Sequence, residues 1–306
     1  MKPTLSIGIP TYNQGEYLEQ TILSVLNQTI KPFELVICNN HSTDGKTEEV
    51  LNKYKNQIIV IKPPKFLSMM ENWNYLCSQL NGEYIALLSS DDFYEPNFVE
   101  TFFKILKPDG VLFRFGFKLV DENGTVLACK KINSAKKKQS FPGNFYEQIR
   151  GPKSNFASFV IKANSFKEVN FFDENLKLVG DWGLWLRLAP LGCFYYSEEI
   201  VSNYRTNYRP TIARDRFELN ISDFIYIYGN IQQQIIEQYG LNKNTRNNSI
   251  KLHFYKMEEM RNSFSLPNSI ILDEFKKMIK GSPINSSLEY LFRSYLQNFR
   301  EYFLKR

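Results

Sequence analysis

The first 110 residues alternate between short apolar runs and segments whose apolar residues recur at helical spacing. This alternation constrains the fold more than any other feature of the sequence. The apolar runs predict strands over residues 5–9, 34–38, 58–61 and 84–88. The segments between them predict helices, and the strand–helix order predicts a mostly parallel sheet covered by helices on both faces, an α/β fold.

Three polar clusters follow these predicted strands, at residues 10–13, 39–44 and 89–92. Open α/β sheets bind ligands at the carboxyl ends of their strands, so the clusters indicate a binding site there. The first strand is not followed by a Gly-x-Gly-x-x-Gly fingerprint, and no Gly-x-x-x-x-Gly-Lys-Ser/Thr loop occurs. The sequence therefore argues against a dinucleotide-dependent oxidoreductase and against a P-loop enzyme.

The later sequence changes character twice. A hairpin is predicted over residues 111–129, a polar segment over 130–155, a strand over 156–161 and a helix over 181–191. From about residue 213 the patterns are helical, over 216–239, 249–264, 268–280 and 286–304. We therefore predict a catalytic domain over 1–212, with halves 1–110 and 111–212, and an α-helical extension over 213–306.

Composition narrows the classes of function. Lys and Arg exceed Asp and Glu by only six charges, which does not predict a nucleic-acid partner. The four cysteines lack metal-site or redox spacing, and two histidines make a zinc cage or a Ser-His-Asp triad improbable. No run reaches 18 apolar residues and no signal peptide is recognised, so we expect a cytoplasmic protein, with peripheral membrane contact left open.

Adjacent carboxylates at Asp91 and Asp92 directly follow the fourth predicted strand. They repel each other, and a divalent cation that bridges a diphosphate would compensate this repulsion, because Mg²⁺ and Mn²⁺ prefer hard oxygen ligands. In the alternative interpretation, one of the two caps the helix that begins near Pro96.

The polar clusters also carry a resemblance. The segments SIGIPTYN (6–13), SVLNQT (24–29), ELVICNNHSTDG (34–45), GEYIALLSSDD (82–92) and GDWGLWLR (180–187) occur in this order. Together they resemble the motifs of family 2 glycosyltransferases, which are inverting enzymes with the GT-A fold. The resemblance covers about residues 3–206 and implies a GT-A fold, which is Rossmann-like, for the predicted catalytic domain.

The resemblance implies a nucleotide pocket at the first two strand ends. Pro10, Thr11 and Tyr12 would line it, and Asn40 stands where the family usually has an aspartate that accepts the uracil N–H. An asparagine oxygen can still accept that bond, although the charge is lost. The alternative for residues 39–44 is a turn held by local side-chain hydrogen bonds.

The resemblance also implies a diphosphate and metal site. Asn72 would lie near the ribose or diphosphate, Asp91 near the ribose or the metal, and Asp92 would bind Mn²⁺ or Mg²⁺ directly. In the alternative, Asn72 caps its helix and Trp73 belongs to the core.

Asp181 matches the catalytic base of the family. A carboxylate on the acceptor side can take the proton of an attacking hydroxyl; Asp181 could equally be the N-cap of its helix. Many relatives have Glu-Asp where this chain has Gly180 and Asp181. Trp182 offers a possible face for a sugar ring, and Arg205 a contact to the acceptor or diphosphate, or an ordinary surface salt bridge.

The function predicted from these motifs is a metal-dependent inverting hexosyl- or N-acetylhexosaminyltransferase that uses a UDP-sugar. Its acceptor would be a glycan or lipid-linked glycan in bacterial surface polysaccharide synthesis, by analogy with the family. The alternative is a nucleotide-sugar-binding module without turnover. The C-terminal helices are expected to pack on the catalytic domain, form a homodimer, or lie on an anionic membrane surface.

Overall fold

We describe residues 5–31, 34–132, 137–149, 151, 156–206 and 222–242 of a computed structural model of the chain. The chain divides into two compact units. The first unit comprises residues 1–145, 152–174 and 188–207, and the second comprises residues 146–151, 175–187 and 208–306.

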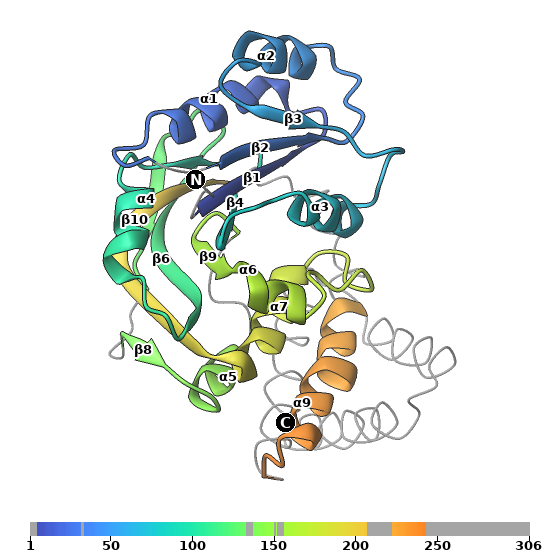
Figure 1. Cartoon of the computed structure of the whole chain (residues 1–306), viewed down its shortest axis with the longest axis vertical. Helices are drawn as coiled ribbons and strands as arrows, with labels where there is room; N and C mark the ends of the chain where they lie inside the picture. Colours follow the sequence, from blue (N-terminus) through green and yellow to red (C-terminus); the bar gives the residue numbers. More distant parts are fainter. Residues whose placement is uncertain are drawn as a thin grey trace, which may run out of the picture. The chain divides into compact units, whose positions relative to one another are not determined.

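A ten-stranded mixed sheet runs through the first unit (Figure 1). Its order is β3-β2-β1-β4-β9-β6-β10-β5, with β7 paired to β6 and β8 paired to β10. The strands are β1 (Leu5–Thr11), β2 (Glu34–Asn39), β3 (Ile59–Ile61), β4 (Tyr84–Leu87), β5 (Phe93–Tyr94), β6 (Gly110–Val120), β7 (Val126–Lys130), β8 (Lys138–Gln139), β9 (Phe159–Lys162) and β10 (Cys193–Arg205).

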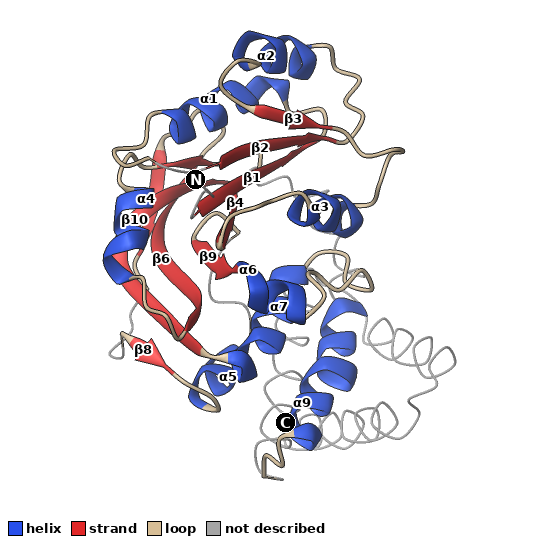
Figure 2. Ribbon diagram, in the orientation of Figure 1, coloured by secondary structure: helices blue, strands red, loops and turns tan. Residues whose placement is uncertain are grey.

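Helices cover both faces of the parallel half of this sheet (Figure 2). The helices whose residues fall in the first unit are α1 (Gly15–Leu26), α2 (Lys46–Tyr54), α3 (Met69–Ser78), α4 (Phe98–Ile105) and α6 (Ala163–Glu168). Figure 1 shows α1 and α2 on one side of β1 and β2 and α3 on the other. The α/β class with the GT-A arrangement that the sequence predicts is therefore confirmed.

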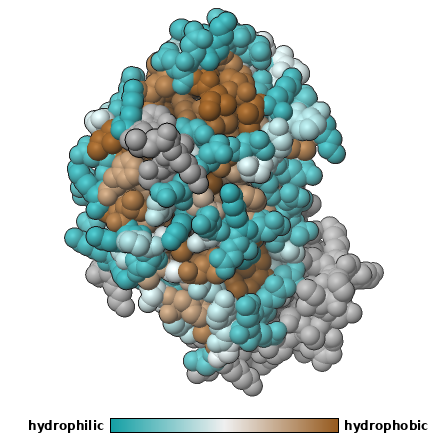
Figure 3. Space-filling view, in the orientation of Figure 1, coloured by the Kyte–Doolittle hydropathy of each residue, from teal (hydrophilic) through white to brown (hydrophobic). Residues whose placement is uncertain are grey.

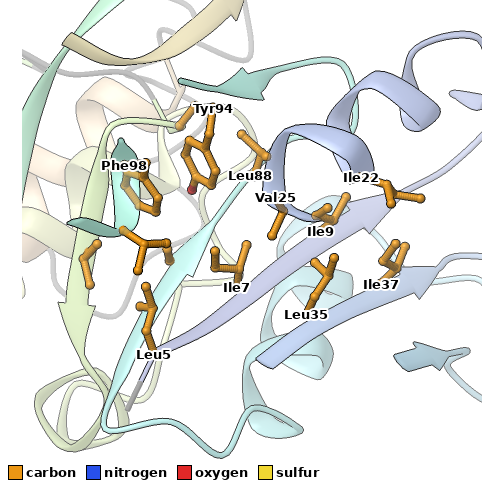
Figure 4. Close-up of a cluster of buried hydrophobic side chains, with 14 of the residues drawn as sticks. Leu5, Ile7, Ile9, Ile22, Val25, Leu35, Ile37, Leu88, Tyr94 and Phe98 are labelled. Carbon is orange, nitrogen blue, oxygen red and sulfur yellow. The ribbon is translucent and has the colours of Figure 1, made fainter. Parts of the chain in front are cut away.

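Alternation along β1 separates these two layers, because successive side chains of a strand point to opposite faces. Leu5, Ile7 and Ile9 are fully buried with the apolar faces of α1, α2 and α4 (Figure 4). Gly8 faces the other way, and a Cβ added there would lie 3.1 Å from Leu76 of α3. Gly8 thus allows α3 to approach the sheet closely.

The strand pairing is parallel throughout the first half of the sheet and mixed in the second, where β6 and β10 pair in parallel but the other pairs are antiparallel. β1, β2, β3 and β4 pair in parallel as predicted, but β9 is inserted antiparallel between β4 and β6. β1 also continues through Pro10, where the sequence predicts its end. β4 pairs with β1 only as far as Gly8, so the proline lies beyond the part of β1 that has neighbours on both sides.

β3 forms one edge of the sheet and leaves apolar side chains in solvent. Ile59 and Val60 are 51% and 43% exposed. The space-filling view shows an apolar patch in this region of the face (Figure 3).

The described part of the second unit is helical in its C-terminal segment. Residues 222–226 are α-helical, a π-helix spans Ile227–Gln232, and α9 spans Gln233–Gln238. These residues lie within the helix predicted over 216–239; the helices predicted over 249–264, 268–280 and 286–304 lie outside the described residues, as does the boundary predicted at 212. In the part of the chain that the structure describes, we find no helix that could cross a membrane.

Candidate functional site

The polar ends of the parallel strands leave the sheet at one edge. Thr11 pairs with Asn39 in the register of β1 and β2, and the Asn40 N–H donates to the Thr11 carbonyl oxygen over 2.9 Å. β4 lies on the other side of β1, and the Leu88 N–H donates to the Gly8 carbonyl oxygen over 3.0 Å. The clusters predicted after the first, second and fourth strands therefore follow neighbouring strands.

An exposed pair of aromatic rings marks this edge. Tyr12, directly after β1, is 45% exposed, and Phe66, in the loop before α3, is 56% exposed. Their ring centroids are 5.0 Å apart and their planes meet at 62°. Tyr12 was predicted to line a pocket, whereas sequence reasoning missed Phe66, because no periodicity or motif indicates where this loop returns. Two exposed rings offer apolar faces on which a flat ligand can stack.

Pro10 and Thr11 lie beneath this surface, within buried β1. The Thr11 hydroxyl has no hydrogen-bond partner among the described residues, although the residue is only 2% exposed. Leaving a buried hydroxyl without a partner costs roughly 1–3 kcal/mol. Such a group is therefore a candidate for a bond to water or to a ligand.

The side chain of Asn40 holds the loop that carries Phe66. Its Nδ2 donates to the Leu67 carbonyl oxygen over 2.9 Å, and its Oδ1 accepts the Leu67 N–H over 3.0 Å. His41 Nε2 donates to the Pro63 carbonyl oxygen of the same loop over 3.0 Å. Both polar groups of the Asn40 side chain are thus engaged with the backbone of one residue, Leu67. An ionised aspartate could not donate the first of these bonds, which explains why this chain has an asparagine here.

Asp44 joins the beginnings of α1 and α2. Its Oδ2 accepts the Gly15 N–H over 3.1 Å, and its Oδ1 accepts the Thr47 N–H over 3.1 Å. Burial raises the pKa of this carboxyl, but the hydrogen bonds from Gly15 and Thr47 outweigh burial and the net pKa is lowered. A Cβ on Gly15 would lie 2.4 Å from the Thr47 nitrogen, so only glycine allows the two helices to begin this close together. The predicted turn with local side-chain bonds is therefore present at this position.

Asn72 lies in the interior instead of at a helix end. It is 4% exposed, and its Oδ1 accepts a hydrogen bond from the Cys38 thiol over 3.2 Å. The N-cap of α3 is Ser68, whose N–H donates to Glu71 over 2.9 Å. The alternative that Asn72 caps the helix is therefore wrong, and the predicted diphosphate contact would need the side chain to leave this bond.

Asp91 and Asp92 lie in different surroundings. Asp91 is half-buried, whereas Asp92 is 1% exposed, with its Oδ1 accepting the Arg205 N–H over 2.8 Å. Burial, followed by the nearby charge of Asp91, raises the pKa of Asp92 well above its usual range, while the N–H and charge of Arg205 lower it by less. Asp92 is thus poorly placed for the direct metal contact that the sequence predicts, and Asp91 is the more accessible carboxylate. Neither caps α4, whose N-cap is Asn97.

Arg205 is buried and its guanidinium makes four hydrogen bonds within the protein, which corrects the predictions of an acceptor contact or a surface salt bridge. The residue is 4% exposed and its guanidinium lies 4.5 Å from the centre of the Tyr17 ring. Its donors reach four acceptors: Nε bonds the Asp91 carbonyl oxygen at 2.8 Å, Nη1 the carbonyl oxygens of Asp121 and Glu122, and Nη2 Gln20 Oε1 at 2.7 Å. Arg205 therefore fixes the turn that contains Asp91.

The carboxylates at this edge can supply only part of the ligands of a divalent cation, so a bound substrate would supply the others. Within the described ranges, no group of three or more His, Cys, Asp or Glu side chains could hold a metal. Asp91 is accessible, and Asp92 Oδ2 is buried without a partner in the same described part of the chain. Mg²⁺ is commonly bound by one or two carboxylates together with substrate phosphates, so Asp91 fits such a cation as its single protein carboxylate.

Asp181 and Trp182 belong to the second unit. Asp181 is half-buried in the first turn of α7 (Gly180–Leu188), and its Oδ1 accepts the Trp182 N–H over 2.8 Å. Trp182 is 1% exposed; its Nε1 donates to the Gln148 carbonyl oxygen over 2.7 Å. The prediction that Trp182 presents a face to a sugar is therefore wrong, because its ring is enclosed in the core of this unit.

Comparison with known proteins gives a family match and distant whole-chain similarities. The sequence model of a family described as "Glycosyl transferase family 2" matches residues 6–160. The chain is 28% identical to the chondroitin synthase of Pasteurella multocida over 245 residues, which are 78% of this chain and 24% of that protein. It spans 64% and 34% of the length of the first two curated relatives that it matches.

Two solved structures share the fold at low sequence identity. The structure of S. aureus TarS 1–349 in complex with UDP-GlcNAc superimposes with a TM-score of 0.67 and 16% identity, covering 98% of this chain and 90% of that one. A mannosyltransferase from Pyrobaculum calidifontis in complex with GDP-Man and Mn²⁺ gives a TM-score of 0.58 and 11% identity, covering 98% of this chain and 88% of that one.

Proposed function

Because the chain belongs to glycosyl transferase family 2, we propose that it is an inverting enzyme that transfers a sugar from a UDP-sugar to a hydroxyl of a glycan or lipid-linked glycan. The observation that carries the proposal is the exposed pair of Tyr12 and Phe66 at the carboxyl edge of the parallel strands. This is the edge at which open α/β sheets bind their ligands.

The aromatic pair is proposed to hold the nucleotide base. Stacking on an aromatic ring contributes roughly 1–3 kcal/mol per base and tolerates any base, so the pair alone does not select uridine. The TarS structure with UDP-GlcNAc supports uridine, whereas the mannosyltransferase with GDP-Man has the same fold with another base. The partnerless Thr11 hydroxyl is a further candidate contact to the nucleoside.

The diphosphate and its cation are proposed to lie at Asp91. Asp91 would hold the cation, and the buried Asp92, bonded to the Arg205 N–H, keeps the backbone of this turn in place. When bound, Mn²⁺ or Mg²⁺ would offset the negative charge of the departing diphosphate. Arg205 supports the same turn through its bond to the Asp91 carbonyl oxygen.

Asp181 is proposed as the general base. The acceptor hydroxyl oxygen forms a bond to the anomeric carbon from the face opposite the diphosphate, and the proton of that hydroxyl passes to the Asp181 carboxylate. The bond between the anomeric carbon and the diphosphate oxygen breaks, and its electron pair leaves with UDP. A positioned base typically contributes roughly 10²–10⁴-fold to the rate. The bond from the Trp182 N–H to Oδ1 fixes the position of this carboxylate.

The sugar and acceptor classes are proposed from the relatives. A hexosyl or N-acetylhexosaminyl group agrees with the UDP-GlcNAc of the TarS structure, and a glycan acceptor agrees with the name of the related chondroitin synthase. We extend this to bacterial surface polysaccharide synthesis, as the family resemblance implies.

A nucleotide screen followed by a turnover assay tests this proposal. UDP with Mn²⁺ should raise the melting temperature more than GDP or ADP, and a UDP-sugar should then release UDP. If UDP binds but none of the UDP-sugars is turned over, the alternative of a binding module without turnover is favoured, as the Gly180 before Asp181 also suggests. If no nucleoside diphosphate binds, the proposed site is wrong.

Alanine substitutions at two exposed positions test the proposed site of the nucleotide base separately. Phe66→Ala should weaken UDP binding by about 1–3 kcal/mol, or roughly 5- to 150-fold, because a stacking face is lost. Ile59→Ala is the matched control, because Ile59 is 51% exposed at the beginning of the edge strand β3 and the proposal gives it no contact with the nucleotide. Equal UDP affinities of the two variants in isothermal titration would show that the aromatic pair does not hold the base.

A further inference from the structure

Three consecutive peptide N–H groups point at one buried carboxylate in the second unit. Asp223 accepts the Lys177 N–H at 2.9 Å on each oxygen, and its Oδ2 also accepts the N–H groups of Leu178 at 2.6 Å and Val179 at 3.0 Å. The residue is 1% exposed and lies in the helical segment 222–226. A run of successive N–H groups forms a concavity that binds an anion, and here the anion is a side chain of the same chain.

These N–H groups immediately precede the proposed base. Val179 accepts the first helical bond of α7, from the Gly183 N–H at 3.2 Å, and Asp181 follows two residues later. Asp223 therefore fixes the backbone at the point where α7 begins. Without this carboxylate, the three N–H groups of residues 177–179 would have to bond to water. The segment would then have no single preferred conformation.

The same C-terminal segment also holds the residue after the base. The Trp182 ring packs edge-on against Phe224 and Tyr228, with centroids 5.1 and 5.7 Å apart. A Cβ on Gly183 would lie 3.2 Å from Ile231, so α7 and this segment approach closely. Asp181 thus lies between a backbone held by Asp223 and a side chain held by Phe224 and Tyr228.

We infer that Asp223, in the predicted C-terminal extension, is a positioning residue for the base Asp181, an inference that rests on the proposed function. It does not touch the reacting atoms. It sets where the Asp181 carboxylate lies by holding residues 177–179. The C-terminal segment thus packs on residues of the predicted catalytic domain, which is one of the roles that the sequence suggests for the extension, and this packing also positions the base.

Asp223→Asn is the test, because it preserves volume but places an amide N–H₂ against three N–H donors. A displacement of the base of about 1 Å costs roughly 10²-fold in rate. We therefore expect kcat to fall about 10- to 100-fold, with the donor KM and UDP affinity within about twofold of wild type. Amide hydrogen exchange over residues 177–182 should accelerate. Asp223→Glu, which keeps a carboxylate near the N–H groups, should retain more activity than Asp223→Asn and serves if the asparagine variant does not fold.

Asp109→Asn is the matched control. The Asp109 carboxylate also accepts two hydrogen bonds, from Lys138 Nζ and from the Tyr195 hydroxyl, both at 2.7 Å, but it lies in the first unit, directly before β6. Its kcat should equal that of wild type.

The inference is overturned if Asp223→Asn accelerates exchange over 177–182 without lowering kcat, since the contact would then be structural only. It is also overturned if a smaller folded fraction accounts for the whole fall in kcat, so that kcat per folded molecule equals that of wild type. If the wild-type chain turns over no UDP-sugar, the proposed function itself fails, and the inference fails with it; accelerated exchange would then still show that Asp223 holds the segment.

Discussion

Asn40→Asp should destabilise the first unit at neutral pH, although it only replaces the side-chain NH₂ group by an oxygen. The Asn40 Nδ2 donates to the Leu67 carbonyl oxygen over 2.9 Å, and the residue is 4% exposed. An ionised aspartate loses this bond, worth about 0.5–1.5 kcal/mol, and places a buried carboxylate against the part-buried Leu67 carbonyl oxygen, which costs about 1–3 kcal/mol more. The free energy of unfolding should therefore fall by about 1.5–4.5 kcal/mol.

The pH dependence makes this prediction specific. The burial and repulsion that destabilise the ionised form raise the folded-state pKa of the new carboxyl above its unfolded value of about 3.9. The loss of unfolding free energy is therefore largest above the folded-state pKa. It shrinks as the pH falls towards about 4, where a protonated aspartic acid can again donate a hydrogen bond to Leu67. Urea unfolding at pH 7 and at pH 4, followed by circular dichroism, measures both values.

Asn97→Asp provides the control for this substitution. Asn97 is the N-cap of α4, where a negative charge is favourable, so this substitution should leave stability unchanged or raise it by up to about 1 kcal/mol. The explanation of Asn40 is refuted if Asn40→Asp is as stable as wild type at pH 7, or if its loss of stability is the same at both pH values.

Two further substitutions test the supports of the site. Asp44→Ala should lower the free energy of unfolding by about 1–2 kcal/mol, because the beginnings of two helices lose their hydrogen-bond acceptor. Since the pKa of Asp44 is lowered, the stability that Asp44 contributes should be constant above about pH 5 and lost as the pH falls through the folded-state pKa. A difference between Asp44→Ala and wild type that grows on acidification would contradict it. Arg205→Lys should cost about 2–4 kcal/mol, since an ammonium cannot reach the four acceptors that the guanidinium bonds, and unfolding at the wild-type urea midpoint would contradict this role.

The order of strands and helices in the first half could be predicted because local signals agree there. Leu5, Ile7 and Ile9 form an apolar run, and Leu18, Ile22 and Val25 recur at helical spacing; all six are fully buried. The antiparallel insertion of β9 could not be predicted, because strand order depends on contacts between residues far apart in sequence.

The site shows a similar division. Residue types and motifs predicted that the site lies at the strand ends, but they did not predict which side chains are accessible there. Asp91 and Asp92 are adjacent and chemically identical, and only the Arg205 N–H and the surrounding core separate a half-buried carboxylate from a buried one. The sequence suggested Trp182 as a sugar platform, and its place in the core follows only from its neighbours Phe224 and Tyr228, which are distant in sequence.

The central claim is that this chain transfers sugar with Asp181 as its base, and release of UDP from a UDP-sugar with Mn²⁺ and a glycan acceptor tests it most directly. Wild type should release UDP, and Asp181→Asn should fall about 10²- to 10⁴-fold while binding UDP as tightly as wild type. Asp109→Asn, assayed beside it, should match wild type. Undiminished UDP release by Asp181→Asn would contradict the assignment of the base.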